Sequence, residues 1–161
     1  MNKISQYELV EILIQQDSTA TKFFFLDQPK LRNTALLGIE VFSANNIAVA
    51  PSQNPVINET VFAKSYLVLV DADSNQERGY QIPLVSLRRA HNSDTSNTSQ
   101  FVTNLQGFSG MNVNYSKSYV VLGNNTGLST TQDESFLFGI TYDQRPASQN
   151  RPAATGTKIR R

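Results

Sequence analysis

The sequence predicts an all-β sandwich or barrel. Short apolar or alternating runs of strand length, separated by turn-rich polar stretches, recur from residue 21 to residue 142. Beyond about residue 20, no segment of helical length shows a clear 3.6-residue apolar period. The stretches between the runs differ widely in length. This favours a jelly roll or another Greek-key winding of about eight strands over a meander with uniformly tight hairpins.

The composition fits one domain with a core of its own, since the chain has 161 residues. Charged residues make up 17% of the chain, below the ~25% typical of soluble domains, and Asn, Gln, Ser and Thr fill the deficit. This balance is common in extracellular β-proteins and in virion proteins, where large like-charge fields would oppose close packing of subunits. We expect an N-terminal arm or helix at 1–20, a jelly-roll domain at 21–143 and an extended basic tail at 144–161.

The N-terminal segment, residues 4–16, fits two periods. Ile4, Tyr7, Val10 and Ile14 form a helical stripe, yet the same segment is rich in residues that favour strands. We expect a helix or an arm docked on an apolar surface, and the simplest such surface is the sandwich of the chain itself.

The first half of the domain then supplies several expected strands. Residues 21–26 form an apolar run that ends at a turn containing Pro29. Residues 35–43 alternate between apolar and polar positions, and residues 47–50 follow a turn. Val61 and Phe62 are expected to open a short strand, and residues 66–70 are the clearest buried run in the chain.

The second half is less regular. Residues 81–87 contain Pro83, which cannot donate to a ladder, so this strand is expected at a sheet edge. Residues 91–100 form a polar low-complexity loop. The last expected strand, residues 135–142, places Phe136, Phe138, Ile140 and Tyr142 on one face. The remaining expected strands are 101–105, 111–115 and 118–122.

The segment 71–75 matches the opening of an EF-hand calcium loop, because Asp71, Asp73 and Asn75 place oxygen ligands on alternate residues. The sixth position lacks the glycine of that motif, and the twelfth lacks its closing glutamate. We therefore expect a strand-to-strand turn with Asx hydrogen bonds. A calcium loop that includes Glu77 is the alternative.

Catalytic constellations are not apparent. His91 is the only histidine, and the chain has no cysteine. The segment 107–110, Gly-Phe-Ser-Gly, is one residue short of a nucleophile elbow and lacks the surrounding helices of that fold. No spacing selects a carboxylate pair for glycoside cleavage among the available acids, which are Asp71, Asp73, Glu77, Asp133 and Glu134. We expect no catalytic residue, no cofactor and no metal, and hence no enzyme.

The basic residues suggest contacts within an assembly. Arg88 and Arg89 follow an expected strand, where they either form a solvated edge or pair with an acid or phosphate of a neighbour. The tail 144–161 has no acid and a single large aliphatic residue, so it cannot bury enough apolar surface to fold alone. We expect it to lie extended against a partner. The candidate assembly contacts are Arg88, Arg89, Arg145, Arg151, Lys158, Arg160 and Arg161.

The strand cores 22–26, 37–42, 65–70, 81–84, 118–122 and 135–142 together resemble the small single jelly-roll capsid proteins, particularly penton or vertex proteins of tailless icosahedral bacteriophages. The resemblance covers residues 20–143 and rests on rhythm and length. It implies an eight-stranded sandwich whose terminal arms bind neighbouring capsomers, and no catalytic residue. The N-terminal segment is short for a long internal arm, so the basic tail would share that role.

The expected function is therefore that of a non-enzymatic virion protein, made in the host cytoplasm. It would form a homo-oligomeric ring, a pentamer in preference to a trimer, and would contact the major capsid protein. A spike protein, an internal membrane or the genome would be further partners of the tail. The alternative is a receptor- or carbohydrate-binding jelly roll, such as a spike or fibre head. Such modules expose Trp and Tyr platforms, whereas this chain has no Trp and its tyrosines lie mostly in strand patterns.

Overall fold

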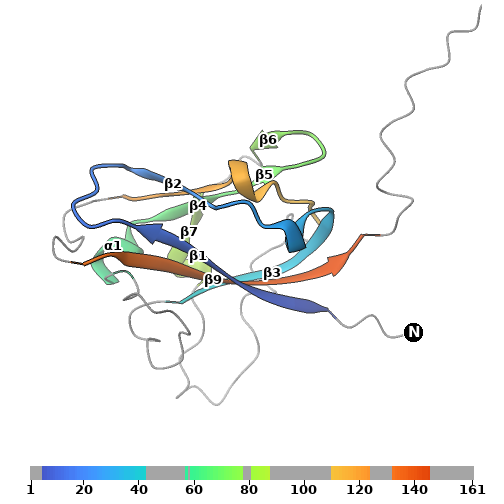
Figure 1. Ribbon diagram of the computed structural model, residues 1–161, viewed down its shortest axis with the longest axis horizontal. Helices are drawn as coiled ribbons and strands as arrows, with labels where there is room; N and C mark the ends of the chain where they lie inside the picture. Colours follow the sequence, from blue (N-terminus) through green and yellow to red (C-terminus); the bar gives the residue numbers. More distant parts are fainter. Residues whose placement is uncertain are drawn as a thin grey trace, which may run out of the picture.

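Two antiparallel sheets lie in layers, one above the other, in the computed structural model (Figure 1). The structure describes residues 5–42, 57, 59–77, 81–87, 110–123 and 132–145. Over these residues the protein is all-β, as the sequence predicted. The lower layer has the order β1-β9-β3 and the upper layer the order β2-β8-β4-β7, while β5 and β6 form a separate hairpin.

The lower sheet is built around its central strand β9, Glu134–Gln144, which pairs with β1, Gln6–Ile14, and with β3, Thr34–Phe42. A bulge in β3 between Leu36 and Gly38 shifts the register of the second pairing. Alternation along β9 points every second side chain into the space between the layers. The predicted inward set is confirmed, since Phe136, Phe138, Ile140 and Tyr142 all belong to the core.

Of the helix and the docked arm expected at the N-terminus, the helix is wrong, because residues 6–14 form strand β1. Each residue of this strand pairs with one residue of β9, from Gln6 opposite Tyr142 to Ile14 opposite Glu134. The strand thereby satisfies backbone groups of β9 and directs Val10 and Ile12 into the core. The segment packs on the chain's own sandwich, as expected, and it does so as a strand.

The upper sheet joins four short strands: β2, Lys22–Phe24; β8, Tyr119–Val121; β4, Tyr66–Val68; and β7, Ile82–Pro83. Leu67 and Val120 face each other across β4 and β8 and are fully buried. The strand β7 stands last in the sheet order. Among the described residues the proline-containing strand therefore lies at an edge, as predicted. The strand is shorter than the expected 81–87, because residues 84–87 form a 3₁₀ turn.

Val61 and Phe62 lie in the one-turn helix α1, Glu59–Ala63, so the strand expected there is wrong. Both side chains are fully buried. A strand would point these consecutive residues to opposite faces, whereas a helical turn at the end of the sandwich directs both into the core. The turn closes with the Ser65 hydroxyl donating to the carbonyl of Val61 at 2.7 Å.

The remaining elements connect the sheets. Short 3₁₀ turns are η1, Pro29–Leu31; η3, Leu84–Leu87; and η4, Tyr115–Lys117. The hairpin consists of β5, Val70–Asp71, and β6, Gln76–Glu77. Of the expected strand 111–115, only Val113 forms a bridge, to Asp71. The expected strands 47–50 and 101–105 and the loop 91–100 lie outside the described residues.

A further backbone contact lies on β3. The amide of Leu36 donates to the carbonyl of Met111 at 2.9 Å, and the amide of Gly110 donates to the carbonyl of Leu36 at 2.7 Å. Leu36 is also opposite Tyr142 of β9. The segment 110–111 therefore lies beside β3.

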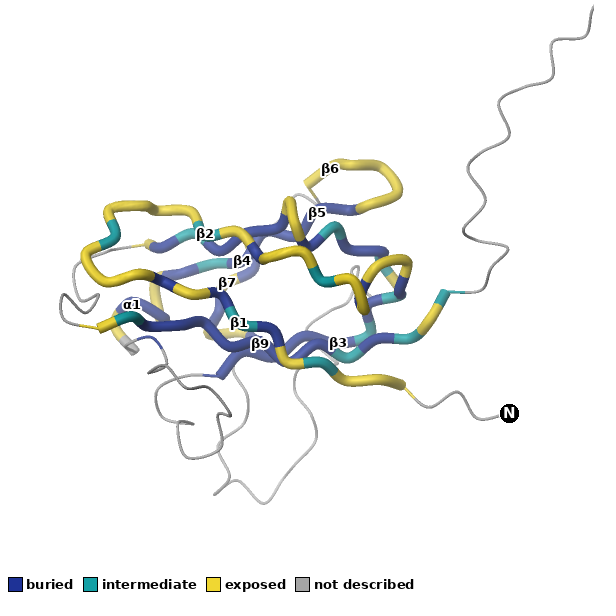
Figure 2. The backbone as a smooth tube through the Cα atoms, viewed as in Figure 1, coloured by how far each residue is buried: buried dark blue, intermediate teal, exposed yellow. Residues whose placement is uncertain are grey.

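The core fills the space between the layers, where the facing stretches of both sheets are buried (Figure 2). Aromatic rings bridge the sheets: the ring centroids of Phe25 and Phe138 lie 5.1 Å apart, and Phe25 also meets Tyr115 edge-on at 5.8 Å. This continuous core fixes the two outward faces of the sandwich relative to each other.

Candidate functional site

Most of the predicted assembly contacts fall outside the described residues. These are Arg88, Arg89, Arg151, Lys158, Arg160 and Arg161. The exception is Arg145, which follows the last residue of β9. Its position can therefore be examined directly.

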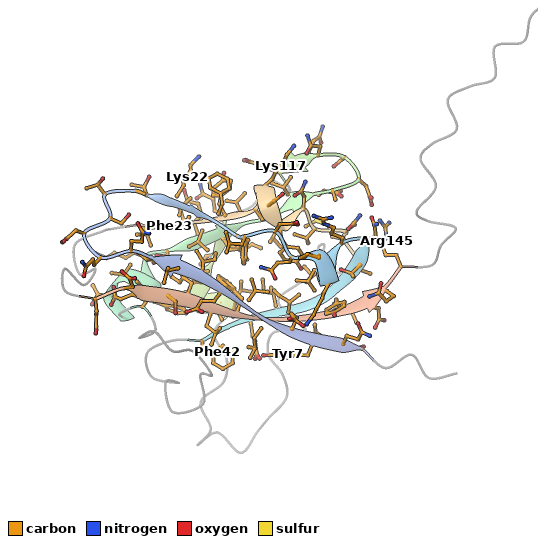
Figure 3. All side chains as sticks on the ribbon, viewed as in Figure 1. Tyr7, Lys22, Phe23, Phe42, Lys117 and Arg145 are labelled. Carbon is orange, nitrogen blue, oxygen red and sulfur yellow. The ribbon has the colours of Figure 1, made fainter. Side chains whose placement is uncertain are left out.

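Arg145 is paired within its own domain. One of its terminal nitrogens donates to both carboxylate oxygens of Asp73, at 3.0 and 2.8 Å, and its side chain is only 15% exposed. This pair ties the end of β9 to the hairpin β5–β6. Figure 3 shows Arg145 at that end of the sandwich. Gln144 is the last residue of β9, and this ion pair holds Arg145 against the hairpin.

The loop 71–75 is the Asx turn that the sequence predicted. The amide of Asp73 donates to Oδ1 of Asp71 at 3.0 Å, and Asn75 has a positive φ of 54°. The oxygens that a calcium ion would need already meet cationic donors: Asp73 binds Arg145, and Asn75 Oδ1 accepts from the Lys117 ammonium at 2.8 Å. Among the described residues, no group of three or more histidine, cysteine or acidic side chains could hold a metal ion.

The candidate catalytic acids do not gather at one site. Asp73 binds Arg145, which directly follows β9, so Asp73 lies near the C-terminal end of that strand. Asp133 and Glu134 lie at the start of the same strand. At ~3.3 Å per residue, this strand separates the two groups by about 30 Å. That distance is too large for a carboxylate pair that would cleave a glycosidic bond. His91 and Ser109 lie outside the described residues.

The outward face of the upper sheet carries the most distinctive surface, here called the aromatic face. Phe23, Val120 and Leu67 face inward in neighbouring strands, so their sequence neighbours face outward. The register forms two outward rows across β2, β8 and β4. The first row is Lys22, Val121 and Tyr66, and the second is Phe24, Tyr119 and Val68.

Tyr119 lies at the centre of the aromatic face and is held by three neighbours. Its ring meets that of Phe24 at 5.3 Å, and the Lys22 ammonium lies 4.8 Å from its centroid. Its hydroxyl donates to Oε1 of Glu77 at 3.0 Å. Desolvation, assisted by this hydrogen bond, raises the pKa of Tyr119 above its usual value.

A hollow of about 330 Å³ lies over part of this face. Its apolar lining comes from Val68 and Val121, its rings from Tyr66 and Tyr119, and its polar groups from Lys22, Glu77 and Gln81. Figure 3 shows Lys22 on the outer side of the upper layer, away from Tyr7 and Phe42 on the lower layer. The hollow is thus open on one side and combines ring faces with hydrogen-bonding groups.

A larger cavity of about 510 Å³ lies where η1, the hairpin and residues 112–116 meet. Asp27 and Arg32 form an exposed ion pair in its lining. Tyr115 is buried, which raises its pKa. Oδ1 of Asn112 is buried without a hydrogen-bond partner, while its amide nitrogen donates to Asp73 at 3.1 Å. Among the described residues of this lining, no nucleophile is paired with a base.

The outward face of the lower sheet carries a cross-strand contact. The Tyr7 hydroxyl, from β1, donates to Oε1 of Glu40 in β3 at 2.6 Å. To reach it, the Tyr7 side chain crosses the central strand over Gly139. The glycine is required here, because a Cβ at this position would lie 2.7 Å from Cζ of Tyr7. This contact is structural and brings together no reactive groups.

Sequence reasoning missed the aromatic face, because Tyr66 and Tyr119 lie in runs that contain almost no polar residue. An alternation of polar and apolar residues, the usual signal of an outward face, is therefore lacking. Only the pairing with β2, whose alternation is Lys22, Phe23, Phe24, shows which side is exposed. Phe24 is 53% exposed, which marks this side as accessible.

Comparison of the chain with models of protein families, with curated proteins and with solved structures finds no match. None of the helices in the described part of the chain is long and apolar enough to cross a membrane. The fold and these surfaces define an all-β protein with a candidate binding face on its upper sheet.

Proposed function

We propose that this chain is a non-catalytic structural subunit of a virus particle with a jelly-roll fold. The observation that carries the proposal is the order in which the strands pair. A jelly roll is a long antiparallel ribbon, with the first strand beside the last and the second beside the one before it, wrapped into two sheets. This winding is frequent in viral capsid domains.

The strand pairings of the described residues support the proposed winding. Strand β1 pairs with β9, β2 with β8, and β4 with β7. The remaining ribbon pair would join β3 to the segment before β8, and residues 110–111 lie beside β3. Wrapping the ribbon also brings β9 beside β3 and β8 beside β4, and both contacts are present.

The two ends of the domain suit a subunit that binds neighbours. Gln6 is opposite Tyr142, so β1 starts at the end of the sandwich where β9 finishes. Asp73 holds Arg145 in place, and residues 146–161, which follow it in the sequence, are basic and contain no acid. We propose that this tail binds an adjacent subunit of a ring, a pentamer in preference to a trimer, or the major capsid protein. An anionic layer such as genome or lipid headgroups is its second candidate partner.

Truncation after Arg145 tests this proposal. The full chain should form a discrete ring in native mass spectrometry, and the truncated chain should remain folded with an unchanged melting temperature but lose the ring. Each exposed charge pair contributes about 0.2–1 kcal/mol, so several must act together. A matched control replaces Arg151, Lys158, Arg160 and Arg161 with glutamine and should weaken the ring at equal tail length. A monomeric full chain, or a truncated chain that assembles equally well, would contradict the proposal.

A second candidate function is that of a receptor- or carbohydrate-binding module. The aromatic face is the observation that favours it. Phe24 is exposed on this face, and the hollow beside it places polar groups next to the Tyr66 and Tyr119 rings. Sites for small ligands commonly combine apolar or aromatic walls with a few oriented polar groups.

A further inference from the structure

We propose that the hollow on the aromatic face binds the end of a neutral oligosaccharide, with Tyr66 as the stacking ring and Lys22, Glu77 and Gln81 as the hydrogen-bonding groups. This inference rests on the second proposed function and names its site and ligand class. It does not depend on the capsid proposal.

The base of the hollow suits the apolar side of a sugar ring. Val68 and Val121 supply aliphatic surface, and Tyr66 lies between Val121 of β8 and Pro83 of the edge strand β7. Tyr66 is partly exposed, whereas Tyr119 is 8% exposed and engaged with Lys22 and Phe24. Tyr66 is therefore the ring available for stacking inside the hollow. Phe24, outside the hollow, offers a second exposed ring to a longer glycan.

The polar groups come from three separate parts of the chain and line one hollow. Lys22 lies on β2, Glu77 on β6, and Gln81 just before β7. Glu77 gives one oxygen to the Tyr119 hydroxyl, and a carboxylate can accept further bonds. The lysine ammonium carries three donors, and the glutamine amide both donates and accepts. Together these groups match hydroxyls, each of which donates and accepts.

The charges select a neutral ligand. Lys22 and Glu77 carry opposite charges in the same lining, so this pair presents no net charge that would attract an acidic or an amino sugar. The volume of about 330 Å³ lies at the low end of the range for ligand sites, which suits the end of a glycan. The contacts among Lys22, Phe24, Tyr119 and Glu77 hold the lining in place before binding, so little side-chain freedom is lost.

A glycan array probed with the labelled full chain, followed by calorimetric titration with the best neutral glycan, tests the inference. The array should include neutral, acidic and amino-sugar oligosaccharides. We expect Tyr66→Ala to weaken binding at least tenfold and Gln81→Leu to weaken it several-fold. Tyr66→Phe should stay within about twofold. The control Leu13→Ala, at a residue 46% exposed on β1, should leave the affinity unchanged.

The outcomes separate the site from the function. Binding that survives Tyr66→Ala and Gln81→Leu unchanged would overturn this site, while a carbohydrate-binding function would stand. Absence of any glycan binding would overturn both. A preference for acidic glycans would overturn the neutral class. If Tyr66→Ala does not fold, the NMR chemical shifts of the Val68 and Val121 methyl groups are followed while the unmodified protein is titrated with the glycan. Chemical shifts that do not change would refute the site.

Discussion

Substitution of Gly139 by alanine should destabilise the protein only while Tyr7 is present. Gly139 lies in the central strand of the lower sheet, opposite Leu9 on one side and Glu40 on the other. A new Cβ would overlap the Tyr7 hydroxyl and would lie 2.9 Å from Cγ of Glu40. Because the glycine backbone is held by ladders on both sides, the side chain of Tyr7 has to move instead of the strand.

The magnitude follows from what Tyr7 loses. Displacement breaks its 2.6 Å hydrogen bond to Glu40, whose residue exposure is only 9%. A hydrogen bond to a charged group contributes about 1.5–3 kcal/mol, and overpacking costs typically 1–3 kcal/mol. Alanine in a strand regains about 0.5–1 kcal/mol relative to glycine. Together these contributions lead us to expect that Gly139→Ala lowers the free energy of unfolding by about 2–5 kcal/mol.

A double-mutant cycle measures this coupling. The four proteins are the unmodified chain, Gly139→Ala, Tyr7→Ala and the double variant, each unfolded in urea and followed by far-UV circular dichroism. In the Tyr7→Ala background the same glycine substitution should be neutral or slightly stabilising, so the coupling energy should exceed about 1 kcal/mol. Tyr7→Phe, which removes only the hydroxyl, should cost about 1–2 kcal/mol.

Equal costs of Gly139→Ala in the two backgrounds would refute the reasoning. They would show that alanine is disfavoured by the backbone or by another neighbour. A Gly139→Ala variant as stable as the unmodified protein would refute it too, since the ring could then not lie over the glycine. The slope of the free energy against urea concentration should be the same in all four proteins, because the surface exposed on unfolding is unchanged.

Two further predictions concern charged and titrating groups. Asp73→Asn should lower the free energy of unfolding, measured by urea titration, by about 1–2 kcal/mol, because the largely buried Arg145 loses its anion. The control Glu8→Gln, at an exposed ion pair, should cost less than about 0.5 kcal/mol. Equal costs of the two substitutions would contradict this prediction. Burial raises the pKa of Tyr115 above the ordinary 10.0. Above about pH 10 the folded state therefore retains a proton that the unfolded state releases. The free energy of unfolding should be constant below about pH 10 and fall above it. Tyr115→Phe should reduce this alkaline loss of stability, as measured by urea unfolding from pH 8 to pH 11; an unchanged loss would show that Tyr115 is not its source.

Local signals in the sequence were sufficient for the all-β class and for several elements. The alternation of Phe136, Phe138 and Ile140 predicts one buried face, because successive side chains of a strand point to opposite sides. Pro83 predicts an edge strand, since it cannot donate to a ladder. The spacing of Asp71 and Asp73 predicts the turn, because an Asx side chain accepts from the amide two residues later.

Tertiary contacts decided the elements whose local signals conflict. Residues 6–14 fit a helical and an extended period about equally, and the long pairing with β9 selects the strand. Val61 and Phe62 have strand propensity, but both must be buried at the end of the sandwich, which a helical turn permits. Propensity is a weak preference that burial and pairing override.

The candidate site could not be predicted from the sequence for the same reason. Lys22, Glu77 and Tyr119 come from distant parts of the chain and meet only when β2 pairs with β8 and the β5–β6 hairpin lies beside that sheet. The Arg145–Asp73 pair joins residues separated by 72 positions. By itself, the sequence determined that the chain forms strands and which side chains many of them bury, since those properties depend on neighbouring residues. The fold determined which strands pair, and therefore which side chains share a surface, since that depends on contacts between residues far apart in the chain.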